Sequence, residues 1–254
     1  MGGTVNELGQ PIGHPVAGWR APERPPRTAM VGRTCRVEPF DSARHVEDLF
    51  RANALDADGR GWTYLPYGPF AEVAAYRRWV DATCLGDDPL FHAVVDPTTG
   101  AAVGVASYLR IDPTLGSIEV GHLRFSPLLQ RKPAATEAMF LMMKRAFDLG
   151  YRRYEWKCDS LNAPSRAAAR RLGFSFEGIF RQALVYKRRN RDSAWFSVID
   201  RDWPALERAF TRWLDPANFD ADGRQRSRLS ELTAPIADAG ASVMPRPDPG
   251  PMRA

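Results

Sequence analysis

Residues 123–174 carry the strongest fold signal in this sequence: LRFSPLLQRKPAATEAMFLMMKRAFDLGYRRYEWKCDSLNAPSRAAARRLGF. Its pattern predicts a strand, a tight polar loop, a helix over 134–149, a second strand over 151–158 and a second helix that ends at Gly173. Gly150 stands where a left-handed residue would close the first helix. Because that helix separates the two strands, we expect them to pair in parallel.

The flanking sequence extends this unit into a single α+β domain. Further strands are predicted at 33–40, 90–96, 101–111, 175–187 and 193–200, the last two joined by RRNRD, and the first strand of the stretch extends back to cover 117–126. Further helices are predicted after Asp41 or Ser42, at about 71–85 and at about 204–214. We expect an extended arm over residues 1–30, the domain over 31–216, and a largely disordered tail over 217–254 that mixes charge, Ala and Pro.

The loop between the first strand and its helix has the chemistry of an anion site. A helix N-terminus leaves backbone N–H groups free and carries the positive end of the helix dipole. Small residues such as Ala134 and Ala135 let the backbone approach a ligand closely. Taken alone, the loop is equally well interpreted as a helix entry with solvated basic side chains.

With its flanks, the stretch resembles the GNAT superfamily of acyl-CoA-dependent N-acyltransferases. In that family a strand of the form hydrophobic-x-hydrophobic-x-Pro enters a loop Q/R-x-x-G-x-G/A, and the matching residues here are Leu123, Phe125, Pro127, Gln130 and Ala135. A helix that begins with Asn and ends in Leu-Gly-Phe follows, here from Asn162 to 172–174. Thr-Glu-Ala after the loop and Asn-x-x-Ser at 162–165 are most similar to the ribosomal-protein-alanine acetyltransferase (RimJ/RimL-type) branch.

The resemblance, which covers about residues 33–200, implies a fold and a co-substrate. The fold is α+β and layered: a mixed, mostly antiparallel central sheet, splayed between its fourth and fifth strands, with helices on both faces. The co-substrate is acetyl-CoA, and no metal is expected. The implied cofactor-binding residues are Leu123, Phe125, Gln130, Arg131, Lys132, Ala134, Ala135, Thr136, Asn162 and Ser165. One departure is Pro133, which replaces the middle glycine of the loop and has no N–H to offer a phosphate.

The chemistry implied by the resemblance is direct attack of an amine on the thioester, which needs a proton acceptor. Glu119 lies close to where several family members carry a glutamate base, although a plain solvated strand residue is the alternative interpretation. In a strand without a bulge, Glu119 and Leu123 share a face and His122 points to the other one. His122 would then act only through a water.

The departing thiolate also needs a proton donor. Many family members use a tyrosine seven residues after the motif asparagine, but Ala169 stands there in this sequence. Ser165 is the candidate acid, as in the RimJ/RimL branch, and a first-turn hydroxyl bonded to backbone is the alternative. Asn162 can cap its helix and hold the pantetheine arm at the same time.

The acceptor amine is predicted to meet the aromatic loop and the end of the second strand. Trp62, Tyr64 and Tyr67 occupy the segment where the family binds acceptors, although packing the loop down is the alternative role. Asp159 can bind a cationic amine. The arginines and lysine around RRNRD are interpreted as a solvated turn or as a contact for an acidic acceptor.

The charge, hydrophobicity and cysteine content of the sequence limit the kinds of partner and location that we expect. The formal net charge of +5 is spread along the chain, so CoA phosphates account for it and we expect no nucleic acid partner. No apolar run reaches the roughly 18 residues of a membrane span, and three cysteines without metal-ligand spacing are typical of a reduced cytoplasmic protein. We expect a monomer or homodimer that acts on a small-molecule or peptide amine. A catalytically weak acyl-CoA-binding module is the competing hypothesis.

Overall fold

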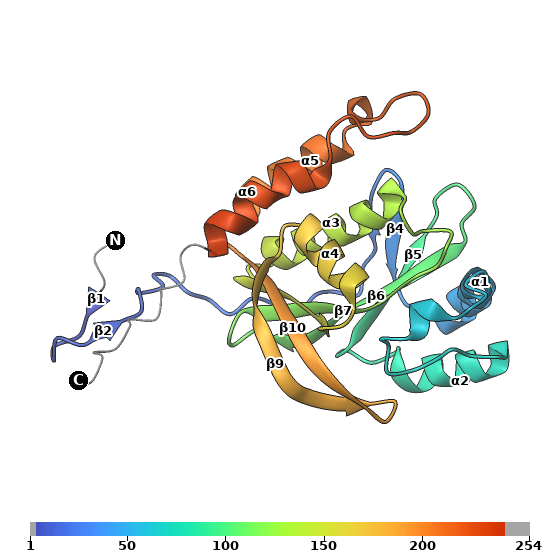
Figure 1. The fold of residues 1–254 in the computed structure, drawn as a ribbon, viewed down its shortest axis with the longest axis horizontal. Coiled ribbons are helices and arrows are strands. Elements are labelled where there is room, and N and C mark those ends of the chain that lie inside the picture. Colours follow the sequence, from blue (N-terminus) through green and yellow to red (C-terminus); the bar gives the residue numbers. More distant parts are fainter. Residues whose placement is uncertain (1–3, 242–254) are drawn as a thin grey trace, which may run out of the picture.

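The centre of the fold is an eight-stranded sheet in the order β3-β4-β5-β6-β7-β8-β10-β9 (Figure 1). The computed structural model describes residues 4–241. The strands of this sheet are β3 Met30–Val31, β4 Arg36–Pro39, β5 Leu90–Val95, β6 Ala102–Asp112, β7 Ser117–Phe125, β8 Arg153–Asp159, β9 Ser175–Tyr186 and β10 Arg189–Ile199. The helices are α1 Ser42–Ala54, α2 Val73–Thr83, α3 Pro133–Asp148, α4 Ala163–Arg171, α5 Trp203–Leu214 and α6 Leu229–Ala241. The predicted mixed, mostly antiparallel α+β architecture is therefore confirmed.

The pairing of β7 with β8 is parallel, as predicted, while the other neighbours in this sheet run antiparallel. The parallel register ends at Val120 opposite Trp156, although β7 runs on to Phe125 and β8 to Asp159. The two strands therefore separate beyond Val120, at the expected splay. Strand β7 also carries a bulge, because its register against β6 shifts between Gly121 and Arg124 and His122 has a φ of 51°.

The helix ends follow the sequence signals. Asp41 caps α1 by accepting the N–H of Arg44, and Asn162 caps α4 by accepting the N–H of Ser165. Pro133 stands in the first turn of α3, where a missing N–H costs little. Gly150 follows that helix with a φ of 95°, a backbone conformation that glycine adopts without strain.

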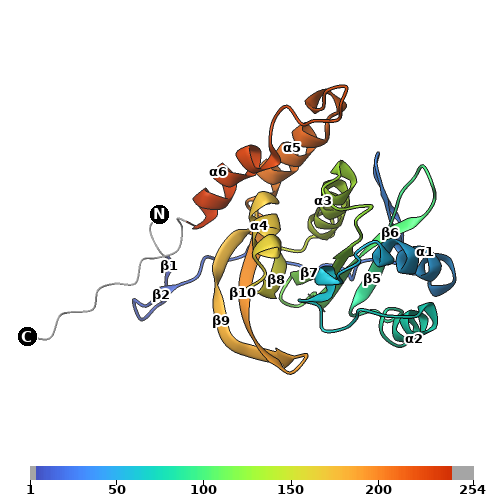
Figure 2. The same cartoon turned by 45° about the vertical axis from the view of Figure 1, so that its right-hand side comes forward.

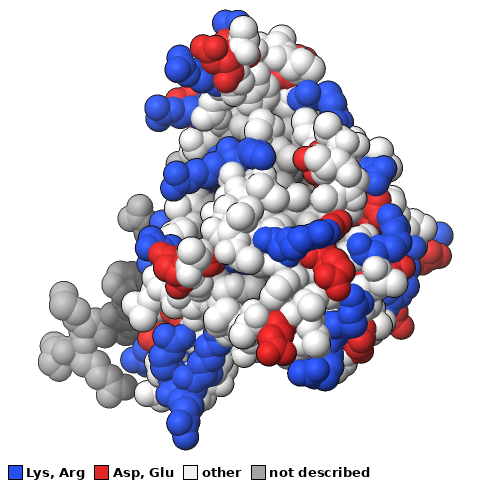
Figure 3. All heavy atoms as spheres, turned by 90° about the vertical axis from the view of Figure 1, so that its right-hand side faces the viewer, with Lys and Arg blue, Asp and Glu red and all other residues white. Residues whose placement is uncertain are grey.

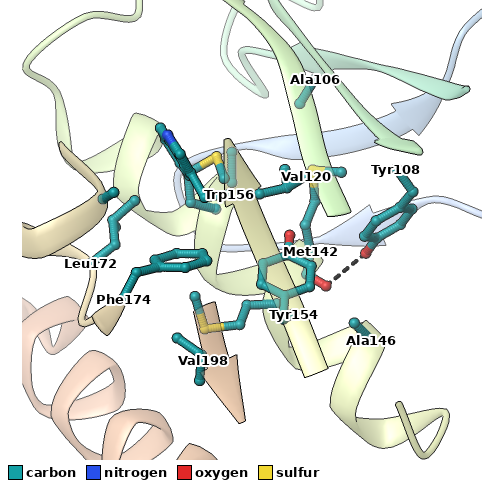
Figure 4. Packing of buried hydrophobic residues seen from close by; sticks show 14 of the residues in the cluster. Ala106, Tyr108, Val120, Met142, Ala146, Tyr154, Trp156, Leu172, Phe174 and Val198 are labelled. Carbon is teal, nitrogen blue, oxygen red and sulfur yellow. Dashed lines mark hydrogen bonds between the residues drawn. The ribbon is translucent and has the colours of Figure 1, made fainter. Parts of the chain in front are cut away.

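Two hydrophobic clusters hold the helices on opposite faces of the sheet. The larger cluster lies under α3 and α4, where Val120, Tyr154, Trp156 and Phe174 pack together (Figure 4). In the same cluster, the hydroxyl of Tyr108 donates to the carbonyl of Met142 at 2.6 Å, which joins β6 to α3. The smaller cluster joins α1 and α2 to β5 and β6, with apolar positions on α1 such as Val46 and Leu49 fully buried.

The predicted disordered tail is wrong over residues 229–241. These residues form α6, which packs with α5 on the outer side of α4 (Figure 2). The helix forms because it has apolar surface to bury: Leu229 and Thr233 are both fully enclosed. Residues 242–254 lie outside the described part of the chain.

The arm and the last hairpin also differ in detail from the prediction. The arm contains a short hairpin, β1 Thr4–Val5 with β2 Pro11–Ile12, before it joins the sheet edge through β3. The β9–β10 turn falls at Lys187 and Arg188, both in left-handed conformations, so β10 begins earlier than the RRNRD segment predicted. In the described residues 4–241, no helix combines the length and apolarity that crossing a bilayer requires.

Candidate active site

A cleft of about 1280 Å³ opens where β7 and β8 separate. Its walls come from β7, β8, β9, β10, the loop after β7, the N-terminus of α4 and part of the aromatic loop 59–70. Residues far apart in the sequence therefore meet at the predicted splay. Separation leaves the facing edges of two strands without ladder partners, so backbone groups there are available to a ligand.

The bulge at His122 changes which residues share a face of β7. Leu123 and Phe125 pack against the same cluster as Val120, and therefore on the face opposite Glu119. The expectation that Glu119 and Leu123 share a face is wrong, because one inserted residue reverses the alternation. Leu123 and Phe125 nevertheless line the cleft, on the stretch of β7 that has no β8 partner.

The loop after β7 brings backbone donors to the rim of the cleft. The N–H groups of Lys132 and Ala135 are already donated within the loop, to the carbonyls of Leu129 at 3.3 Å and of Lys132 at 3.1 Å. Those of Arg131 and Ala134 donate to no described residue. Arg131 has a φ of 61°, which turns the backbone sharply into α3. Of the loop residues predicted to bind the cofactor, Arg131 and Ala134 therefore have backbone N–H groups that are free to receive an anion.

Two other predicted residues of this region, Gln130 and Thr136, have protein contacts of their own. The side chain of Gln130 donates to the carbonyl of Phe125 at 2.7 Å. Thr136 is buried, and its hydroxyl accepts from Arg171 at 3.0 Å. The adjacent Glu137 turns away from the cleft and accepts the N–H groups of Arg33, Thr34 and Cys35, which ties α3 to the edge of the sheet.

The N-terminus of α4 contributes a fixed hydroxyl. Ser165 accepts the indole N–H of Trp156 at 3.0 Å, so the serine proton stays free to be donated. The neighbouring thiol of Cys158 lines the same cleft, and burial raises its pKa. Ala169 is fully buried in the larger hydrophobic cluster, where its side chain presents no proton donor.

Glu119 is a buried ion-pair partner, so its interpretation as a plain solvated residue is wrong. Its carboxylate accepts from Arg110 at 2.7 Å through both oxygens and from Lys157 at 2.9 Å. Lys157 also bridges to Glu155 at 2.8 Å and lies 3.7 Å from the centre of the Trp195 ring. Both oxygens of Glu119 are therefore engaged by cations, of which Arg110 has the more exposed side chain.

Asp159 is the carboxylate of the cleft that lacks a cation. It is 4% exposed, accepts the hydroxyl of Tyr186 at 2.8 Å and the N–H of Leu161 at 2.9 Å, and forms no ion pair with the described residues. Burial and the Asp159 carboxylate raise the pKa of Tyr186 to about 12, so the tyrosine stays a neutral donor. An acceptor ammonium entering the cleft would find its counter-charge here.

The aromatic side chains of the loop 59–70 have two different roles: some line the cleft, and others pack against the protein. Tyr64 lines the cleft, and its hydroxyl donates to the carbonyl of Leu161 at 3.1 Å. Trp62 and Tyr67 do not line it: Trp62 is buried beneath the guanidinium of Arg124, and the Tyr67 ring stacks on His122. Burial lowers the pKa of His122 to about 4, with Arg110 adding to the shift, so this ring is a weak base at neutral pH.

The β9–β10 turn holds the aromatic loop in place. Basic side chains gather along the lower edge of Figure 3, where this turn lies. Lys187 donates to the carbonyls of Trp62 and Gly68, both at 2.9 Å, and Arg189 donates to that of Thr63 at 2.9 Å. Two of these basic residues therefore hold the aromatic loop by hydrogen bonds, a role that the interpretation as a solvated turn did not include.

Several residues of the site escaped the sequence interpretation because their positions depend on strand register. Lys157 follows Trp156 on β8 and reaches Glu119 only because the two strands are parallel neighbours. Tyr186 comes from β9, which lies beyond β10 in the sheet. The alternation of Trp156, Lys157 and Cys158 across the faces of β8 was the one signal that could have indicated Lys157.

Comparisons with known proteins agree with this geometry. Residues 35–175 match the family model described as an acetyltransferase (GNAT) domain, which is more than half of the chain. A GCN5-related N-acetyltransferase from Brucella melitensis is 47% identical, with a TM-score of 0.84 over 86% of this chain and 99% of that one. A probable GNAT-family acetyltransferase from Chromobacterium violaceum is 45% identical, with a TM-score of 0.72 over 77% and 98%. The chain belongs to the GNAT acetyltransferase family.

The likeness to the RimL branch is distant. A ribosomal L7/L12 alpha-N-protein acetyltransferase, RimL, solved in complex with coenzyme A, is 20% identical, with a TM-score of 0.55 over 68% of this chain and 98% of that one. At this identity the comparison supports the fold alone. No curated protein matches the sequence.

Proposed function

We propose that this protein is an acetyl-CoA-dependent N-acetyltransferase that acylates a primary amine, either a protein N-terminus or a small molecule, by direct attack on the thioester. One observation carries the proposal. Arg131 with its free N–H, Ser165 with its hydroxyl and Asp159 with its unpaired carboxylate all line one cleft, and the free N–H of Ala134 lies three residues beyond Arg131, in the first turn of α3. The diphosphate of CoA, the departing thiolate and the acceptor amine would therefore each have a protein group to bind. A cytoplasmic location and a monomeric or homodimeric state complete the proposal.

The chain's own residues divide the binding of acetyl-CoA among them. The diphosphate would accept the N–H groups of Arg131 and Ala134 at the N-terminus of α3. The pantetheine arm would run between the unpaired stretch of β7 and Asn162 at the start of α4. Backbone N–H groups at Leu123 or Phe125 would polarise the thioester carbonyl, which increases its electrophilicity.

The proposed reaction moves one acetyl group and two protons, one from the ammonium to a carboxylate and one, by way of Ser165, to the thiol of CoA. Asp159 holds the acceptor ammonium, and the amine becomes nucleophilic when it loses a proton to a carboxylate of the cleft. The amine nitrogen then bonds to the carbonyl carbon, the carbon–sulfur bond breaks, and Ser165 donates its proton to the thiolate; the second proton, which the nitrogen loses as the amide forms, returns to the Ser165 oxygen. Trp156 favours this direction of donation by occupying an acceptor site of the serine oxygen.

We propose Glu119 as the residue that accepts the proton of the amine. Its ion pairs restrict when its carboxylate is accessible. Both of its oxygens accept from cations, so they would be open to an amine only if Arg110 swings out. Asp159 needs no such movement, because its partners are a hydroxyl and an N–H. Turnover of Glu119→Gln and Asp159→Asn separates the two: the true acceptor loses kcat, whereas an amine anchor loses mainly apparent amine affinity.

A second candidate function is an acyl-CoA-binding module without efficient catalysis. It is favoured by Pro133, which removes one loop amide, and by Ala169, which removes the usual acid. The two candidates share the cofactor and differ in turnover.

A thiol-release assay decides between them. Acetyl-CoA is supplied with a panel of amines that includes short peptides with free N-termini, polyamines, amino sugars and amino-acid derivatives. Amine-dependent release of CoA supports the acetyltransferase. Binding of acetyl-CoA by calorimetry without turnover of any amine supports the binding module. No binding at millimolar acetyl-CoA would exclude both.

A further inference from the structure

A side cavity of about 310 Å³ adjoins the cleft, between the N-terminal part of α3 and α4, which lines it from Asn162 to Leu172. It shares Ala135, Asn162 and Ser165 with the main cleft. The charged side chains that line it are Arg124 and Arg171, and no Asp or Glu lines it. Its electrostatic character is therefore positive.

The two arginines differ in how their charge is balanced. The side chain of Arg124 is 3% exposed and pairs with Asp56 at 3.0 Å. Arg171 has no carboxylate within ion-pair distance in the described part of the chain. Its guanidinium has one hydrogen bond to the protein there, from Nη1 to the hydroxyl of Thr136 at 3.0 Å. An arginine carries five N–H donors, so most of those on Arg171 remain available to a ligand.

Arg171 is held in position by the two C-terminal helices. The Trp213 ring of α5 lies 5.1 Å from its guanidinium carbon. Thr233 of α6 donates its hydroxyl to the backbone carbonyl of Arg171 at 3.0 Å, which satisfies one of the free carbonyls at the end of α4. Both helices lie beyond residues 35–175, the part that matches the family model. Burial lowers the pKa of Arg171, but a guanidinium remains charged at any physiological pH.

We propose that Arg171 binds the diphosphate of the CoA co-substrate, and that α5 and α6 hold it in place to do so. The inference rests on the proposed function. Thr136, to which Arg171 is bonded, lies two residues after Ala134 in the same first turn of α3. A diphosphate on the free N–H groups of the loop would therefore lie beside this guanidinium. The planar fork of an arginine matches phosphate oxygens and supplies the donor that Pro133 removes from the loop.

The test compares Arg171→Met with the matched control Arg170→Met. Arg170 is the preceding arginine of α4, exposed and directed toward the Phe176 ring rather than into the cavity. Steady-state kinetics are measured with acetyl-CoA, with acetyl-dephospho-CoA, which lacks only the 3′-phosphate, and with S-acetylpantetheine, which lacks both the diphosphate and the adenosine; S-acetyl-4′-phosphopantetheine, which keeps one phosphate without the adenosine, separates these two groups. Thermal unfolding of each variant is recorded in parallel.

Arg171→Met should raise KM for acetyl-CoA and acetyl-dephospho-CoA by the same factor, about 10- to 100-fold, the usual worth of hydrogen bonds to a charged group. It should leave kcat/KM for S-acetylpantetheine within about twofold of the wild type, because that substrate lacks the group recognised. Arg170→Met should match the wild type with all four. An equal loss with S-acetylpantetheine would assign Arg171 a structural role and overturn the proposal. An effect confined to acetyl-CoA would move the contact to the 3′-phosphate and overturn it in this form.

A measurement on the wild-type protein keeps the test decisive if the variant does not fold. A guanidine-selective dicarbonyl reagent is applied with CoA or with pantetheine, and the modified peptides are identified by mass spectrometry. CoA should protect Arg171 and pantetheine should not; equal modification under both conditions would contradict the proposal. If the wild type neither binds nor turns over acetyl-CoA, the proposed function itself fails, and that outcome is distinct from an unchanged Arg171 variant.

Discussion

Replacing Ser165 by alanine removes the hydroxyl that we propose as the proton donor to the leaving thiolate. In the structure this oxygen accepts the indole N–H of Trp156 at 3.0 Å, so its own proton is directed elsewhere. A positioned general acid contributes about 10²- to 10⁴-fold to a rate. A thiolate is a comparatively stable leaving group, so we expect the lower end, a fall in kcat of about 10²-fold. Because Ser165 is not proposed to hold the phosphates, KM for acetyl-CoA should change by less than about threefold.

The same substitution leaves the Trp156 indole without its acceptor. A buried donor that loses its partner costs about 1–3 kcal/mol, which should appear as a lower free energy of unfolding in urea. Ser165→Thr is the matched variant, because it retains the hydroxyl and should retain most of the rate. Thiol release with saturating amine measures kcat, and urea unfolding confirms that each variant is folded at the assay temperature. A folded Ser165→Ala variant with kcat within twofold of the wild type would refute the assignment.

Three further predictions concern stability and reactivity. Asp56→Asn should cost about 3–5 kcal/mol in urea unfolding, because it strands the buried guanidinium of Arg124, whereas Asp58→Asn, from an exposed pair, should leave the free energy of unfolding almost unchanged; similar losses would contradict this. Burial lowers the pKa of both His92 and His122 to about 4 from an ordinary value of 6.5. Their contribution is therefore fully present above pH 6.5 and is lost as the pH falls toward 4, by up to about 3 kcal/mol each. His122→Gln should lose less stability than the wild type between pH 7 and pH 4.5, and an equal loss would count against this. Burial raises the pKa of all three cysteine thiols, so Ellman's reagent at pH 8 should react with them slowly in the native protein and with all three after denaturation; rapid native labelling would show the opposite.

The sequence predicted the elements of the fold well where local signals and global packing agree. Asn162 is an N-cap, Gly150 closes α3, and the helix between β7 and β8 makes their pairing parallel. The prediction of a disordered tail failed because α6 is stabilised by tertiary burial of residues such as Leu229. Composition alone does not reveal that contact.

The candidate site was predicted less completely, because side-chain contacts across a sheet depend on register. A single bulge at His122 placed Glu119 and Leu123 on opposite faces of β7, and its local signal is Gly121, since an isolated glycine inside a strand pattern suggests a bulge. The ion pairs of Glu119 join strands that are distant in the chain, as does the bond between Asp159 and Tyr186. Backbone sites were more predictable, since the anion loop follows from the strand-to-helix connection itself.

The most direct test of the account is a crystal structure of the protein with coenzyme A. We expect the diphosphate within hydrogen-bond distance of the N–H groups of Arg131 and Ala134, and the thiol next to the hydroxyl of Ser165. Coenzyme A bound outside the cleft between β7 and β8, or with its thiol directed away from Ser165 and Asp159, would contradict it.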